Sequence, residues 1–215
     1  MAITRACEQC GTAFLPRREH SRFCSAQCRV AWNCEHARHE GVSSAALDWS
    51  LTAMTEATAR LARSRPSGAG AAEVHAVVAV SDAVWWVTIV DATLVRYHPE
   101  AYETALAGLP RAQRLLTEGT FAGLRYVRNR MGYFADHADF IQPRPSAAGD
   151  QDAPIAAWTW KAMSKPPLDT LPPRGQAWEM NRYWAYQERL AGHAIGETFN
   201  LAADFLTLAS SDHAA

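Results

Sequence analysis

Two closely spaced pairs of cysteines near the amino end constrain this chain more than any other feature. Cys7 and Cys10 are separated by two residues, Cys24 and Cys28 by three, and thirteen residues lie between the pairs. Such spacing suits a tetrahedral site with four sulfur ligands. Gly11 follows the first pair and can adopt the positive φ that a tight metal-binding turn requires. The sequence therefore predicts that Cys7, Cys10, Cys24 and Cys28 bind a structural Zn²⁺ ion.

The second pair of cysteines is expected to lie on a helix. An offset of four residues places the sulfurs of Cys24 and Cys28 on one helical face, and Ser25 is a candidate N-cap. The segment 12–22 between the pairs is long enough for a hairpin. Zinc binding contributes about 10 to 16 kcal/mol to the folding of such small units, so a module with little core can be stable.

Disulfides are the alternative to a metal site. The first five residues contain no apolar leader segment, so we expect a cytoplasmic protein whose thiols stay reduced. A fifth cysteine, Cys34, lies close to His36 and His39 and is either an idle thiol or a substitute ligand.

The stretch of about residues 5–38 resembles the short bacterial zinc fingers of the FCS type, which have a treble-clef arrangement. The residues that carry this resemblance are Cys-x2-Cys-Gly followed by Arg-Phe-Cys-Ser-x2-Cys-Arg. Such fingers bind nucleic acid or protein. If this one binds nucleic acid, the candidate contacts are the clustered arginines Arg17, Arg18 and Arg22, which otherwise form a solvated hairpin tip.

The remaining chain is expected to be a helical bundle, which makes the protein mainly α. Glycine and proline clusters mark the loops, and the prolines concentrate in a Pro/Trp-rich loop over 142–175. We assign residues 1–40 to the finger and 41–215 to the bundle. Helices are predicted over residues 44–63, 71–97, 100–108, 111–141 and 176–209.

The segment 71–97 contains many β-branched residues, which would suit strands. No glycine, proline or asparagine interrupts it, so a single helix is the better interpretation. A membrane span is excluded because Asp82 and Asp91 leave only eight uncharged residues between them, where about 20 are needed.

A three-four rhythm of core-facing residues runs through 176–209, from Trp184 to Leu208. Glu179 is expected on the polar face of that helix.

The helix predicted over 111–141 is the most basic part of the chain. Residues 111–130 contain five arginines and one glutamate, a net charge of +4. At 100° per residue, Tyr126, Arg130, Tyr133 and His137 share one edge of this helix. Such a face could serve RNA, because arginine binds phosphate, tyrosine stacks on bases and histidine transfers protons near neutral pH. The other interpretation is an ordinary core boundary.

The sequence Leu-Arg-Tyr-Val-Arg-Asn-Arg within this helix resembles the corresponding helix of HEPN domains. The resemblance implies an all-helical, dimeric protein, and many members are metal-independent ribonucleases of toxin and defence systems. The family motif is an arginine, often followed by asparagine or another polar residue, and a histidine after four to six intervening residues.

Two registers compete for this motif. If Arg128 and Asn129 begin it, Tyr133 stands where the histidine is expected, and a phenol cannot act as the base near pH 7. If Arg130 begins it, the spacing to His137 is acceptable, but the asparagine precedes the arginine. In the active register, His137 would take the proton from a ribose 2′-OH while Arg130 steadies the phosphate.

Two classes of function follow from these patterns. The first is a zinc-finger protein that acts on or binds RNA, with Arg125 and Tyr126 as further contacts to nucleic acid. The second is a non-enzymatic regulator whose finger recognises nucleic acid or a protein and whose bundle forms a homodimer. Trp158 and Trp160 of the 142–175 loop, together with Trp178, either seal the bundle or form a lid over a ligand.

Overall fold

The computed structural model describes residues 4–16, 21–39, 44–64, 70–133, 140–144, 157–166 and 173–211. The chain divides into two compact units, Met1–Ser43 and Ser44–Ala215, close to the expected division at residue 40. The described elements are mainly α-helical, as predicted.

The amino-terminal unit contains a small hairpin and one helix, α1 (Ala26–His39). Strand β1 (Arg5–Ala6) pairs antiparallel with β2 (Ala13–Phe14). These two strands flank the first cysteine pair, whereas the hairpin expected in 12–22 includes residues 17–20, which lie outside the described residues. The Cys7 N–H donates a hydrogen bond to the Thr12 carbonyl at 2.9 Å, and this bond closes the hairpin around the cysteine pair.

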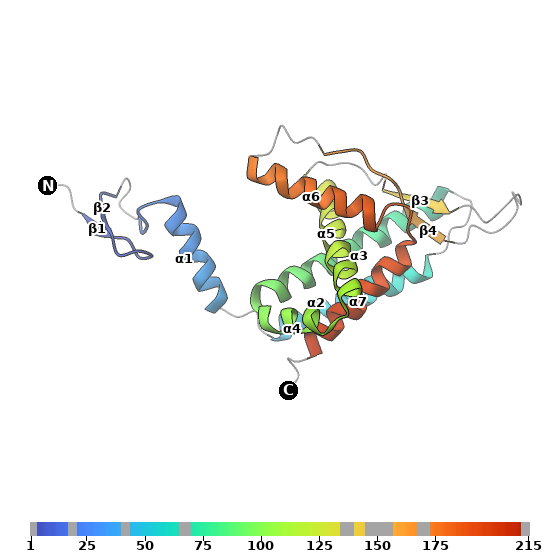
Figure 1. Ribbon diagram of the computed structural model, residues 1–215, viewed down its shortest axis with the longest axis horizontal. Coiled ribbons are helices and arrows are strands. Elements are labelled where there is room, and N and C mark those ends of the chain that lie inside the picture. Colours follow the sequence, from blue (N-terminus) through green and yellow to red (C-terminus); the bar gives the residue numbers. More distant parts are fainter. Residues whose placement is uncertain are drawn as a thin grey trace, which may run out of the picture. The chain divides into compact units, whose positions relative to one another are not determined.

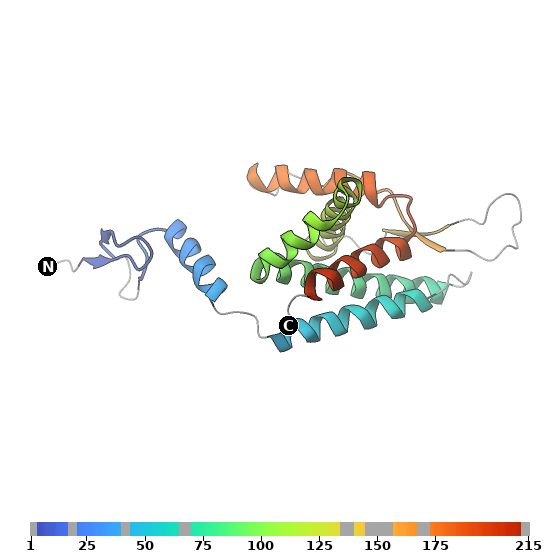
Figure 2. The same cartoon turned by 60° about the horizontal axis from the view of Figure 1, so that its bottom comes forward.

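The second unit contains six helices among its described residues, and Figures 1 and 2 show how they stack. They are α2 (Ser44–Arg63), α3 (Gly70–Tyr97), α4 (Pro99–Gly108), α5 (Arg111–Tyr133), α6 (Pro173–Arg189) and α7 (Ile195–Ser210). The first three lie where the sequence predicts them.

Helix α3 is the central helix of this unit. It packs against α2, α4, α5 and α7, and its valines at positions 80, 84, 87 and 90 are completely buried. Burial therefore outweighs the strand preference of these residues. By length and composition, Val74–Tyr97 could also cross a membrane, but half of that apolar segment is buried within the unit, as in the core helix of a soluble protein.

Two other boundaries differ from the prediction. The helix predicted over 111–141 cannot extend to its expected end, because Ile141 begins a strand, β3 (Ile141–Arg144). This strand pairs antiparallel with β4 (Ala157–Trp160), so part of the expected loop is a hairpin.

The last predicted helix is two helices. Gly192 has a φ of 80° and ends the helical path between α6 and α7. Its N–H donates to the Trp160 carbonyl at 2.8 Å, and the Trp160 N–H donates to the His193 carbonyl at 3.1 Å. Trp184 and Leu208 are exposed, although both belong to the predicted core rhythm.

The tryptophans of strand β4 seal the unit. Trp160 is completely buried, Trp158 nearly so, and the indole N–H of Trp160 donates to Thr198 Oγ1 at 2.9 Å. The described residues therefore favour the sealing role over a lid for these two side chains, whereas Trp178 is exposed and does not seal the unit.

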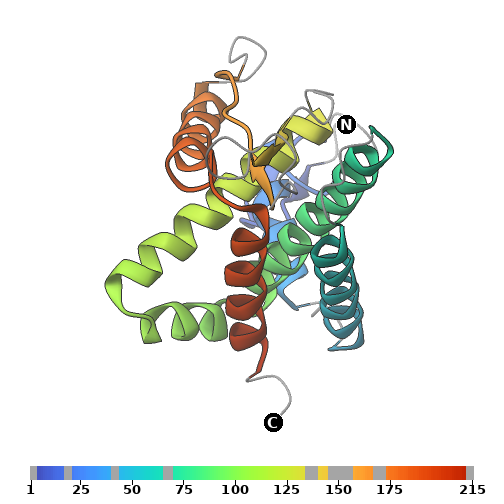
Figure 3. The same cartoon turned by 90° about the vertical axis from the view of Figure 1, so that its right-hand side faces the viewer.

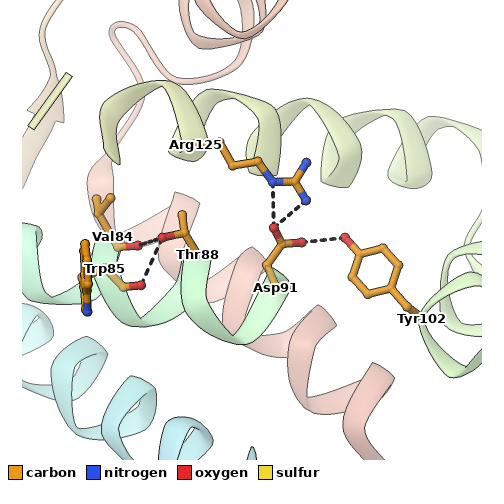
Figure 4. A network of polar contacts seen from close by, with 6 residues as sticks. All are labelled: Val84, Trp85, Thr88, Asp91, Tyr102 and Arg125. Carbon is orange, nitrogen blue, oxygen red and sulfur yellow. Dashed lines mark hydrogen bonds and ion pairs between the residues drawn. The ribbon is translucent and has the colours of Figure 1, made fainter. Parts of the chain in front are cut away.

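A buried ionic network connects α3, α4 and α5 (Figure 4). Asp91 is completely buried and accepts hydrogen bonds from the Tyr102 hydroxyl at 2.9 Å and from Arg125 Nε at 2.8 Å. Burial raises the pKa of Asp91, while the neighbouring guanidinium of Arg125 opposes that rise.

Candidate metal centre

The first half of the candidate metal centre is the turn that follows β1. The Gly11 N–H donates to the Cys7 carbonyl at 2.8 Å, and Gly11 has a φ of 71°, as expected for this position. This turn directs the sulfurs of Cys7 and Cys10 to the same side. Cys7 is also the one buried hydrophobic residue among the described side chains of the finger.

The second half lies at the start of α1. Ser25 Oγ accepts a hydrogen bond from the Cys28 N–H at 3.1 Å, which confirms Ser25 as a capping residue. Cys24 precedes the helix and Cys28 lies in its first turn, so their sulfurs meet 3.5 Å apart.

The two halves bring the four sulfurs together. The Sγ atoms of Cys7, Cys10, Cys24 and Cys28 all lie within 4.8 Å of one another, and those of Cys10 and Cys24 are 3.7 Å apart. All four cysteines are free thiols. This is the donor set and spacing of a site that could hold a metal ion, as the sequence predicts.

The surroundings of the sulfurs favour thiolates at the first cysteine pair. Burial opposes ionisation of Cys7, but backbone hydrogen bonds from Cys24, Cys10 and Gln9 prevail and lower its pKa to about 6. The Thr12 hydroxyl lowers the pKa of Cys10.

Crowding has the opposite effect on Cys24. The neighbouring sulfurs of Cys28, Cys10 and Cys7 raise its pKa to about 12. Four thiolates would repel one another in so small a volume, and a divalent cation would remove that repulsion.

Arg22 connects two parts of the finger through its side chain. Its Nε donates to Glu8 Oε1 at 2.8 Å, and its guanidinium lies 4.6 Å from the centroid of the Trp32 ring. Of the three arginines expected to contact nucleic acid, Arg22 is thus engaged within the finger, while Arg17 and Arg18 lie outside the described residues. The side chains of Cys34, His36 and His39 are also outside the described part of the chain.

The two further residues expected to contact nucleic acid are engaged within the helical unit. Arg125 pairs with Asp91, and its side chain is about one-third exposed. Tyr126 is completely buried and donates from its hydroxyl to the Ser164 carbonyl at 3.0 Å. Tyr126 therefore presents no ring face to solvent in this conformation.

The three residues Arg128, Asn129 and Arg130 point to different neighbours. Arg128 lies over the Trp85 ring of α3 at 5.3 Å, and Asn129 Nδ2 donates to Glu179 Oε2 of α6 at 2.8 Å. Arg130 is buried, with its guanidinium 6.0 Å from the centroid of the Tyr126 ring. Tyr126 and Arg130 therefore lie next to each other, as expected from their spacing on one edge of the helix. The Tyr133 side chain and His137 lie outside the described residues.

Sequence reasoning missed the part that Glu179 plays. The prediction that it lies on a polar face is wrong, because it is 3% exposed and bonded to Asn129. The signal that could have found it is its spacing of four, seven and eleven residues from the buried Tyr183, Tyr186 and Leu190, which is a helical period along α6.

Comparison of the chain with protein-family models, with curated proteins and with solved structures finds no match. The function is therefore inferred from the residues of the chain itself.

Proposed function

We propose that this protein holds a structural zinc ion with its four cysteines and uses the finger so formed to bind nucleic acid, RNA in preference to DNA. The helical unit would pair two copies of the chain, in the cytoplasm, where thiols stay reduced. The observation that carries the proposal is the convergence of the four cysteine sulfurs within 4.8 Å.

Zinc is the ion that fits these sulfurs best. A tetrahedral site with Zn–S bonds of about 2.3 Å separates its sulfurs by about 3.8 Å. The Cys10–Cys24 and Cys24–Cys28 separations of 3.7 and 3.5 Å are close to that value. Four sulfur ligands leave no open position for substrate, so the ion would stabilise the finger and not catalyse a reaction.

Nucleic acid is proposed as the partner because of two exposed arginines. Arg5 on β1 and Arg29 on α1 each lie next to a cysteine-bearing turn, and both are exposed. Arginine suits bidentate contacts with phosphate. The preference for RNA rests on the resemblance of the α5 sequence to HEPN domains.

Fluorescence anisotropy with labelled single-stranded RNA and DNA tests this proposal. Replacement of both Arg5 and Arg29 by alanine should weaken RNA binding by about tenfold or more and reduce its salt dependence. Arg63→Ala, an exposed arginine of α2, is the control and should leave binding unchanged. Equal binding by all three proteins would refute a role for the finger.

A second candidate function, metal-independent RNA cleavage, is favoured by one observation. Buried Arg130 lies beside Tyr126, one residue from the Asn129–Glu179 pair, on the last turns of α5 that precede His137. If these residues form a site, His137 would accept the proton of a ribose 2′-OH and Arg130 would stabilise the phosphate. The 2′ oxygen would then attack phosphorus as the bond to the 5′ oxygen of the next nucleotide breaks, which gives a 2′,3′-cyclic phosphate and, with a proton from water, a free 5′-OH.

Incubation with transfer RNA and total RNA in the presence of a chelator separates the two functions. Cleavage with cyclic phosphate ends that is lost in His137→Ala and Arg130→Ala, but kept in the exposed control Arg96→Ala, would establish the enzyme. If the RNA stays intact with every protein, cleavage is refuted and only the proposed binding function remains.

A further inference from the structure

The two halves of the metal centre are also connected by residues that carry no sulfur. The first half is the turn with Cys7 and Cys10, and Glu8 lies within that turn. The second half is the start of α1 with the residues before it, where Arg22 precedes Cys24 by two positions. Figure 1 shows β1, β2 and α1, the elements on which these residues depend.

Arg22 contacts the first half through both its backbone and its side chain. The Glu8 N–H donates to the Arg22 carbonyl at 3.1 Å. The guanidinium in turn donates to both carboxylate oxygens of Glu8, from Nε to Oε1 at 2.8 Å and from Nη2 to Oε2 at 2.5 Å. Two parallel hydrogen bonds fix the relative orientation of the two side chains, which one bond does not.

The same guanidinium contacts the second half. Its central carbon lies 4.6 Å from the centroid of the Trp32 ring and 5.4 Å from that of the Phe23 ring. The two rings are themselves in contact, with centroids 5.6 Å apart. Trp32 follows Cys28 by four residues and therefore lies about one turn further along α1. A cation at such a distance is attracted to the ring face, so Arg22 connects the first cysteine turn with the helix of the second pair.

We propose that Arg22 is a positioning residue of the metal centre, which clamps the Cys7–Cys10 turn to α1 and thereby tightens the binding of zinc. Arg22 donates to a carboxylate and lies over aromatic rings, so it acts through the positions of the cysteines and not as a ligand. This inference rests on the proposed function, because it concerns the affinity of that site for its ion. It also assigns a role to one of the three arginines predicted to contact nucleic acid.

Zinc affinity depends on such contacts because the finger has little apolar core. Cys7 is the one buried hydrophobic residue among its described side chains. Metal binding and folding of the finger are then one equilibrium, so a contact made only in the folded finger adds to the apparent affinity for zinc. The side chains of Arg22 and Glu8 are 51% and 41% exposed, which limits the contribution of their ion pair. Removal of the clamp is therefore expected to weaken zinc binding without abolishing it.

Competition with a chelator of known affinity measures the zinc dissociation constant of the full chain. Arg22→Ala should raise this constant by about tenfold, because the ion pair and the ring contacts are lost together. Glu8→Ala should raise it by about threefold, because Arg22 keeps its ring contacts. Gln27→Ala, at an exposed position between Cys24 and Cys28, is the control and should leave the constant unchanged. An unchanged constant in Arg22→Ala would overturn the inference.

The double variant separates a clamp from a general effect of charge. Arg22→Ala and Glu8→Ala remove opposite charges, so an electrostatic field acting on the thiolates would shift the dissociation constant in opposite directions. A clamp requires both substitutions to raise it. The double variant should then bind zinc about tenfold more weakly than the natural protein, as Arg22→Ala does, and not about thirtyfold. Opposite shifts, or fully additive ones, would overturn the clamp.

Cobalt(II) in place of zinc reports on the geometry of the site. At saturating cobalt, Arg22→Ala should show the same visible absorption bands of a tetrahedral thiolate complex as the natural protein, because its four ligands are intact. Loss of these bands would mean that the substitution destroys the site, and a role limited to positioning would be refuted.

The helical unit serves as an internal reference for folding. Figure 3 shows α7 beside α2 and α3, and these helices pack through a continuous apolar core. The thermal transition of this unit should therefore be the same in every variant. A natural protein that binds no zinc would refute the proposed function itself, whereas equal zinc affinity with and without the Arg22 side chain would refute only this inference.

Discussion

Among single residues, two buried carboxylates hold the helical unit together. Asp91 joins α3 to Tyr102 of α4 and to Arg125 of α5, and Glu179 joins α6 to Asn129 of α5. A buried charge is tolerated only when its hydrogen bonds are made, so each carboxylate specifies how its helices meet.

Removal of the Asp91 carboxylate is expected to be severe. Asp91→Ala leaves the Arg125 guanidinium without its ion pair and should lower the free energy of unfolding by about 3–5 kcal/mol. Asp82→Ala breaks the exposed pair with Arg60, whose atoms are 3.2 Å apart, and should cost less than about 1 kcal/mol. Urea denaturation of both variants checks this, and comparable losses would contradict it.

Alkaline pH should destabilise the protein through its buried tyrosines. Burial raises the pKa of Tyr126 to about 12 and also raises the pKa values of Tyr102 and Tyr186. Tyrosine in the unfolded chain ionises near pH 10. As the pH rises from about 10 to 12, the unfolded state releases protons that the folded state retains, so the folded state loses stability.

Tyr126→Phe isolates the contribution of that tyrosine. The variant should be about 1 kcal/mol less stable at neutral pH, because the hydrogen bond to the Ser164 carbonyl is lost. Its further loss of stability above about pH 10 should be smaller than that of the natural protein. Urea midpoints of both proteins measured across this pH range test this prediction. Parallel plots of midpoint against pH for the two proteins would contradict it.

Between elements, α5 and α6 cross where glycines allow close approach. A Cβ atom at Gly123 would lie 2.8 Å from Leu190 Cδ1 and 3.2 Å from the backbone Cα of Tyr186. At Gly119, one turn earlier, the nearest atom would be Arg189 Cγ at 2.9 Å, in a flexible side chain. The two glycines therefore differ in what an added methyl group must displace.

Alanine substitutions distinguish these two positions. Gly123→Ala should lower the free energy of unfolding by about 1–3 kcal/mol, because α6 must shift its backbone. Gly119→Ala should be neutral or stabilising by up to about 1 kcal/mol, because alanine favours the helix and Arg189 can move. Thermal and urea denaturation measure both, and a greater loss at Gly119 would disprove this account of the crossing.

Across the full chain, the two compact units depend on different cores. Among the described side chains of the finger, Cys7 alone is a buried hydrophobic residue, whereas the second unit has a continuous core of its own. A bound metal ion would therefore do for the finger what apolar packing does for the helical unit.

Removal of the metal should affect the two units differently. A strong chelator should release one zinc ion per chain and unfold the finger, while the thermal transition of the helical unit stays at the same temperature. Cys24→Ser should reproduce the chelated state and should not recover on addition of zinc. Elemental analysis and circular dichroism check these outcomes. A chelator that also lowers the transition of the helical unit would show that the units are not independent.

Several features could be predicted from the order of residues alone: the convergence of the four cysteines at the candidate metal centre, the turn at Gly11, the cap at Ser25 and the positions of α2, α3 and α4. These features arise from residues close together in the chain, where spacing and periodicity carry the information. The valines of α3 show the limit of this reasoning, because their helix had to be argued from the absence of a turn and not from their own preference.

Three-dimensional contacts were needed for the β3–β4 pair, the break at Gly192 and the burial of Asp91 and Tyr126. The strand residues bond to partners across a loop, Gly192 takes its positive φ where β4 meets the turn between α6 and α7, and each buried polar group depends on a donor or acceptor from another element. Contacts between distant residues leave no period in the sequence, so local patterns could not reveal them.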